Sequence, residues 1–139
     1  MNGIKEISDT PKEHLKSLSP SANSVFFYGI YIVILAAMFL FIPNAVLQLM
    51  GMKTTNEVWI HILGWFGIWL GIYYIVAGRS EAKTFIVTTV YGRPTFFVFL
   101  GVLVALKMIE PVILVIAGID IATAIWTGLL LRSEKTLTN

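Results

Sequence analysis

A small set of polar side chains lies inside long apolar runs of this 139-residue chain, and these residues have the types that could do chemistry. Arg93 and Asp120 carry opposite charges. Thr123 and Thr127 follow Asp120 by three and seven residues, so their hydroxyls share its helix face, and Thr89 lies one turn before Arg93. A cation, a carboxylate and several hydroxyls can orient the head group of a ligand or hold two helices in register.

The composition places these side chains in a membrane protein. Hydrophobic residues make up 57% of the chain and charged residues 13%, which is too little polar surface to cover a soluble domain of this length. Runs of about 18 or more nearly uncharged residues recur, each long enough to cross roughly 30 Å of hydrocarbon as a helix. We therefore expect an all-α, multi-pass four-helix bundle whose surroundings are the lipid bilayer.

The elements that must position the polar residues are four spans within a transmembrane domain of residues 24–132. The spans are expected at about 25–42, 59–78, 84–106 and 111–131, with an N-terminal arm at 1–23 and a tail at 133–139.

The third span crosses the membrane only if it begins near Thr84. Thirteen residues starting at Pro94 would measure about 20 Å, whereas 23 residues starting at Thr84 measure about 34 Å. The longer helix places Arg93 near mid-membrane and is expected to kink at Gly92–Pro94, because proline removes a backbone donor and crowds the preceding turn.

The distribution of lysine and arginine predicts the orientation. Seven of these residues lie on the side shared by the arm, the 78–84 turn and the tail: Lys5, Lys12, Lys16, Arg79, Lys83, Arg132 and Lys135. The opposite side has two, Lys53 and Lys107. Both termini are therefore expected in the cytoplasm.

The two charges at depth are expected to pair with each other. Arg93 precedes Lys107 by 14 residues and Asp120 follows Glu110 by 10, which is a stagger of about 6 Å along antiparallel helices. An unpaired charge at mid-membrane costs several kcal/mol, so we expect a buried, hydrogen-bonded Arg93–Asp120 ion pair. Such a pair either locks the third and fourth spans together or forms part of a ligand site.

The span at 59–78 has two contrasting faces. Small residues that let another backbone approach closely are Gly64, Gly67 and Gly71, and this seam packs either within the bundle or across a homo-oligomer. Trp65 and Trp69 cover a different face. Together with Trp126 of the last span, they are candidates for an aromatic wall around an apolar ligand.

Several kinds of chemistry are absent from the sequence. The chain has no cysteine, which excludes disulfides, thiolate metal sites and thiol nucleophiles. Its two histidines show no metal-ligand spacing, so no metal and no cofactor is expected. The basic residues do not cluster with exposed aromatic residues, and no nucleic-acid partner is expected.

Three sequence stretches resemble small bacterial four-helix membrane proteins of the BphX-like and DoxX-like kind. They are "LGWFGIWLGIYYIVAGRSEAKTF", "TTVYGRP" and "AGIDIATAIWTGLLLR", and the resemblance covers roughly residues 59–132. It implies a bacterial inner-membrane location and singles out Arg93 and Asp120. DoxX-type relatives are associated with quinone-linked membrane complexes. The resemblance assigns no reaction to this chain.

Three functions remain as hypotheses. The favoured one is an accessory or structural bundle, homo-oligomeric or packed with other membrane subunits. The alternative is a binding protein for a lipophilic small molecule, such as a quinone, isoprenoid or aromatic hydrocarbon, held in the bundle interior. An intramembrane enzyme would use Asp120 as acid or base, but the sequence offers no second proton donor at that depth.

Overall fold

The computed structural model describes residues 18–137, and every secondary-structure element in that part of the chain is a helix. Helices α1 (Pro20–Phe41), α3 (Trp59–Arg79), α4 (Lys83–Ala105) and α5 (Ile113–Leu137) are each long and apolar enough to cross a membrane. The expected all-α bundle of four membrane-crossing helices is confirmed. Residues 1–17 of the expected arm and 138–139 of the tail lie outside the described residues.

The ends of the helices follow from local sequence signals. Ser19 caps α1 by accepting a hydrogen bond from the Ala22 N–H, and Pro20 occupies the first turn, so α1 begins five residues before the expected span. A second proline, Pro43, separates α1 from the short α2 (Pro43–Leu49). Helix α4 runs without interruption through Pro94, and α5 continues to Leu137.

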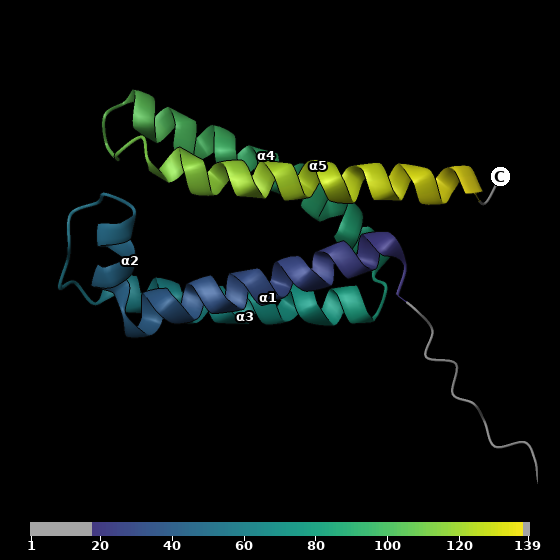
Figure 1. Ribbon diagram of the computed structural model, residues 1–139, viewed down its shortest axis with the longest axis horizontal. Helices are drawn as coiled ribbons and strands as arrows, with labels where there is room; N and C mark the ends of the chain where they lie inside the picture. The colour runs from purple at the N-terminus through teal and green to yellow at the C-terminus, as the bar shows by residue number, and fades with distance from the viewer. Residues whose placement is uncertain (1–17, 138–139) are drawn as a thin grey trace, which may run out of the picture.

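The helices form two antiparallel pairs. Helix α1 packs most extensively against α3, and α4 packs against α5. Helix α1 also contacts α5, and this contact joins the pairs (Figure 1). The pairs meet near the start of α1 and separate toward the end that carries α2 and the α4–α5 connection, as Figure 1 shows. The described termini and the α3–α4 turn therefore share one end of the bundle, here called the termini end.

A seam of small residues joins α1 to α3. Gly64, Gly67 and Gly71 all face α1: a Cβ atom on Gly64 would lie 2.6 Å from the Leu40 nitrogen, and one on Gly71 would lie 2.9 Å from the Gly29 oxygen. A Cβ atom on Gly67 would lie 2.7 Å from the Cβ atom of Ala36. The glycine seam is thus used within the bundle, where the absence of side chains lets two backbones touch.

Adding one methyl group to this seam is expected to be destabilising. In Gly64→Ala the new Cβ would meet only α1 backbone, at 2.6–2.9 Å, so the helices must separate. We expect a loss of about 1–3 kcal/mol in the free energy of unfolding in mixed micelles. Gly101→Ala in α4 is the matched control, because nothing lies within 4 Å of its Cβ position. Equal stability of the two variants would contradict a close α1–α3 contact.

The termini end holds the buried core and a set of hydrogen bonds to the start of α1. Ala22, Val25 and Ile86 are fully buried there. The Ser21 N–H and hydroxyl both donate to the carboxylate of Glu134 on α5, each at 2.8 Å, which satisfies one of the free donors of the first turn of α1.

Three hydrogen-bonded contacts follow one another along α1 and α5. The Ser21–Glu134 contact comes first, the buried Ser24 and Thr127 hydroxyls lie 2.9 Å apart, and the Tyr28 hydroxyl donates to Asp120 at 2.8 Å. This α1–α5 polar ladder ties the two helix pairs together, because α1 belongs to one pair and α5 to the other.

The middle rung of the ladder can be tested by a double-mutant cycle. Ser24→Ala and Thr127→Val each remove one hydroxyl of the buried pair, and the double variant removes both. We expect a coupling free energy of about 0.6–1 kcal/mol, the size found for side-chain hydrogen bonds between membrane helices. Additive effects of the two substitutions would show that the hydroxyls do not interact.

Candidate functional site

A half-open cleft lies between the two helix pairs. Its volume is about 470 Å³, and all four long helices contribute to its walls. The walls are mostly apolar, and they include Leu35 and Phe39 of α1, Leu70 of α3, Phe96 and Leu100 of α4, and Ile116 of α5. Met50, just after α2, also lines the cleft, which places the cleft on the side where the pairs separate.

Arg93, Tyr28 and Asp120 form a polar cluster in the cleft lining. Arg93 is 4% exposed and Asp120 is 7% exposed, so both charged residues are buried as expected. The Arg93 guanidinium carbon lies 3.7 Å from the centroid of the Tyr28 ring and 5.3 Å from that of Tyr74. The Tyr28 hydroxyl donates to Asp120. One tyrosine therefore contacts the cation through its ring and the carboxylate through its hydroxyl.

The direct ion pair expected between Arg93 and Asp120 is not present in the described part of the chain. The Arg93 nitrogens lack any hydrogen-bond partner, and the carboxylate of Asp120 is bonded to Tyr28 instead. The spacing along the chain predicts the depth of both groups, but depth does not determine the direction in which a side chain points. The face of α5 that carries Asp120 also carries Thr127, and both residues bond to α1.

The contacts of Arg93 leave its hydrogen-bonding capacity unused. Tyrosine rings interact with the faces of a guanidinium, which is worth about 2 kcal/mol when the pair is desolvated. The N–H donors point outward in the plane of the group and need acceptor oxygens. Buried donors without an acceptor keep the cost of their desolvation. The Nε, Nη1 and Nη2 atoms are buried donors at the edge of an apolar cleft.

The three candidate threonines are bonded mainly to their own helices. Thr89 is buried and donates to the Ile86 carbonyl at 2.8 Å, while Thr123 donates to the carbonyls of Ile119 and Asp120. Thr127 is 1% exposed and belongs to the α1–α5 polar ladder. None of the three lines the cleft, which leaves Arg93, Tyr28 and Asp120 as its polar groups together with the hydroxyls of Tyr31 and Tyr74.

The tryptophans lie on outward-facing surfaces. Trp65, Trp69 and Trp126 are 54%, 44% and 54% exposed, and none of them lines the cleft. The face of α3 that packs against α1 is occupied by the glycine seam, so the neighbouring large residues point away from the bundle. The aromatic side chains in the cleft are instead the tyrosines of α1 and α3 and the phenylalanines Phe39 and Phe96.

Sequence reasoning missed Tyr28 and Tyr74 as site residues. A signal for Tyr28 was present: Ser21, Ser24 and Tyr28 have the 3–4 spacing of one helix face, within a span that is otherwise apolar. On α5 the matching residues, Asp120, Thr127 and Glu134, recur at intervals of seven. Two polar faces with matching periods indicate helices that pack against each other. Tyr74 carries no comparable signal.

The fold and the cleft define the class of this protein as a small helical multi-pass membrane protein with a buried arginine and a buried aspartate. Comparisons with protein-family models, with curated proteins and with solved structures give no match. Within residues 18–137, no three side chains among His, Cys, Asp and Glu gather closely enough to hold a metal ion.

Proposed function

We propose that the chain binds a lipophilic small molecule in the cleft between its two helix pairs, with a head group that offers oxygen acceptors to Arg93. The observation that carries this proposal is the Arg93 guanidinium, which is buried beside the cleft with no hydrogen-bond partner for any of its nitrogens. Ligand oxygens would satisfy these donors, which otherwise keep their desolvation cost of about 1–3 kcal/mol each.

The size and lining of the cleft support the same ligand class. Its volume of about 470 Å³ falls within the range of small-molecule sites, which are mostly apolar with a few polar groups that fix orientation. A quinone, an oxygenated isoprenoid or an oxygenated aromatic compound has this pattern of one polar end and an apolar remainder. The opposite charges of Arg93 and Asp120 favour a neutral head group over one that would bring a third charge into the site.

The proposal can be tested with defined probes and one blocking variant. Decylubiquinone, farnesol and 2-naphthol represent the three ligand classes, and binding of each is measured by thermal shift and by native mass spectrometry from mild detergent. Ile116→Trp, one turn from Asp120 in the cleft wall, is expected to abolish binding of the best probe. Val115→Trp is the matched control, because Val115 is 69% exposed and does not line the cleft. Equal binding by both variants would contradict the proposed site.

An accessory role remains a second candidate function, favoured by the outer face of α3. Trp65, Trp69 and Tyr73 form a run of exposed rings whose neighbouring centroids are 6.3 Å apart. Aromatic residues of this kind are enriched in protein interfaces, and another copy or another membrane subunit would cover them. The mass of the complex retained from mild detergent, with Trp69→Leu as the variant, tests this role.

The family relationship also remains a proposal. The resemblance to BphX-like and DoxX-like proteins on residues 59–132 supports placing the chain beside them, and it points to the same buried residues, Arg93 and Asp120.

A further inference from the structure

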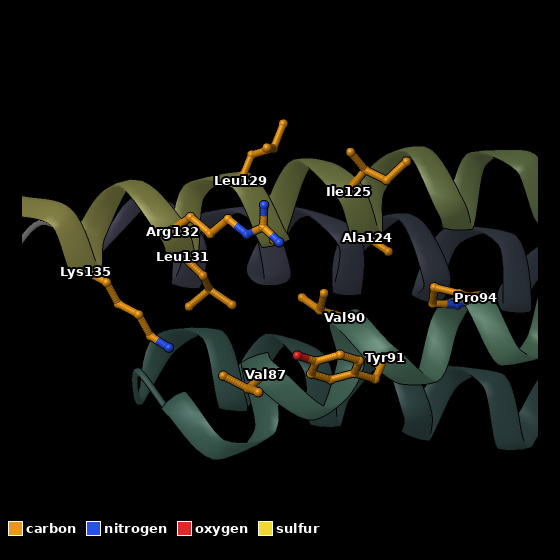
Figure 2. A pocket seen from close by; sticks show the side chains of 11 residues that line it. Val87, Val90, Tyr91, Pro94, Ala124, Ile125, Leu129, Leu131, Arg132 and Lys135 are labelled. Carbon is orange, nitrogen blue, oxygen red and sulfur yellow. The ribbon is translucent and has the colours of Figure 1, made fainter.

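A second cavity lies between α4 and α5 and is separate from the interior cleft (Figure 2). Its volume is about 450 Å³, and it has no lining residue in common with the cleft. Its walls are apolar along most of their length and include Val87 and Val90 of α4 and Ala124 and Gly128 of α5. We call this cavity the α4–α5 groove.

Small residues of α5 form the floor of the groove. Ala124 is 1% exposed, and a Cβ atom on Gly128 would come within 3.3 Å of the Val90 side chain, so the two helices are close at this point. Ile125 and Leu129 stand on the outer side and are mostly exposed. The result is an apolar slot along two membrane-crossing helices, a shape that suits a hydrocarbon chain.

One end of the groove is basic. Arg132 and Lys135 lie one turn apart on α5 and both line the groove, and Figure 2 shows Lys135 extending toward α4 near Val87. Glu134, the acidic residue between them in sequence, points elsewhere, because its carboxylate accepts two hydrogen bonds from Ser21 of α1. Arg132 and Lys135 thus place two basic side chains at this end of the groove.

The basic end also lies at the depth where a lipid head group is found. Arg132 directly follows the apolar run that ends at Leu131, so it marks the edge of the membrane-crossing part of α5. Tyr91, which is 72% exposed, lines the groove farther from this end, two residues before Arg93. The groove thus runs from an interfacial cationic end into the apolar zone.

We propose that the α4–α5 groove binds one anionic phospholipid, with an acyl chain along Val87 and Gly128 and the phosphate between Arg132 and Lys135. The planar guanidinium of arginine donates two parallel hydrogen bonds to a phosphate, and lysine adds a point charge. The apolar slot and the cationic end lie next to each other, as the two parts of a phospholipid do. This site does not depend on the ligand proposed for the interior cleft.

The experiment compares two lipids that share the phosphate and the acyl chains but differ in head group and net charge. The full chain in mild detergent is titrated with phosphatidylglycerol or phosphatidylcholine of identical acyl chains, and bound lipid is counted by native mass spectrometry. We expect tighter binding of phosphatidylglycerol. Arg132→Gln should weaken that binding about fivefold and weaken phosphatidylcholine less, because the choline cation offsets the charge of its phosphate, whereas Arg132→Lys should retain most of the phosphatidylglycerol binding. Val87→Trp, which fills the apolar slot, should weaken both lipids.

Lys107→Gln is the matched control, because it removes the same charge at the opposite end of α4 and should leave the lipid preference intact. Equal binding of the two lipids, or equal effects of Arg132→Gln and Lys107→Gln, would overturn the proposal. So would soluble glycerol phosphate binding as tightly as phosphatidylglycerol, since the slot would then contribute nothing. A dimer that Val87→Trp dissociates would show that a second copy of the chain occupies the groove.

Discussion

Replacing Arg93 with leucine is expected to abolish stabilisation of the protein by its cleft ligand. A ligand present at 100 times its Kd stabilises the wild-type chain by about 2.7 kcal/mol. In Arg93→Leu the ligand loses its charge-assisted hydrogen bonds, each worth about 1.5–3 kcal/mol, so two such bonds reduce affinity about 100-fold or more. The measurement is the shift in unfolding temperature on adding the best probe of the panel.

Arg93→Lys separates charge from geometry in the same assay. Lysine keeps the positive charge but lacks the planar fork that donates two parallel hydrogen bonds, so affinity should fall to an intermediate value. Arg79→Leu is a suitable control, because Arg79 lies at the termini end, over the Phe26 ring, and does not line the cleft. An Arg93→Leu protein that is stabilised by the ligand as strongly as wild type would rule out Arg93 as the head-group anchor.

The second large effect is expected from Tyr28→Phe. This substitution keeps the ring beneath the Arg93 guanidinium but removes the hydroxyl that donates to Asp120, which leaves a buried carboxylate without that partner. Leaving a buried charged group unsatisfied costs about 3 kcal/mol. We expect a loss of this size in the free energy of unfolding, measured in mixed micelles.

A second substitution shows whether the cost comes from the carboxylate. Tyr28→Phe combined with Asp120→Asn removes the charge that lost its donor, so the double variant should be more stable than Tyr28→Phe alone. If the losses in the free energy of unfolding caused by Tyr28→Phe and Asp120→Asn simply add, the Tyr28–Asp120 hydrogen bond does not account for the loss in Tyr28→Phe. Tyr31→Phe serves as the control, since Tyr31 also lies on the cleft side of α1 but its hydroxyl has no bond to Asp120 in the described structure.

The elements of the fold could be predicted because each span carries its own signal. Hydropathy and length indicate four crossings without reference to tertiary structure, and the length of the third span alone required Arg93 to lie at depth. The ends of the helices were predicted less well, since α1 begins five residues before the expected span and α5 ends at Leu137 instead of residue 131. Ser19 and Pro20 extend α1 backward by a cap that the hydropathy pattern does not detect.

The partners of the buried groups could not be predicted with equal success. Spacing along the chain indicates how deep Arg93 and Asp120 lie, but the rotation of each helix about its axis decides what they face. The glycine seam turns the tryptophans of α3 outward, and the α1–α5 polar ladder turns Asp120 toward Tyr28. Both rotations depend on contacts with α1. The expectation of an Arg93–Asp120 pair considered only the third and fourth spans, so it did not include these contacts. The predicted orientation of the termini stays a prediction.

The hydrogen bonds between α1 and α5 have a consequence for biogenesis. The glycine seam joins helices that leave the ribosome one after the other, so the first pair can assemble early in the membrane. Ser21 lies 113 residues before Glu134, and Tyr28 lies 92 residues before Asp120. The polar side chains of α1 therefore lack these partners, in the bilayer or in the insertion machinery, until α5 has been synthesised.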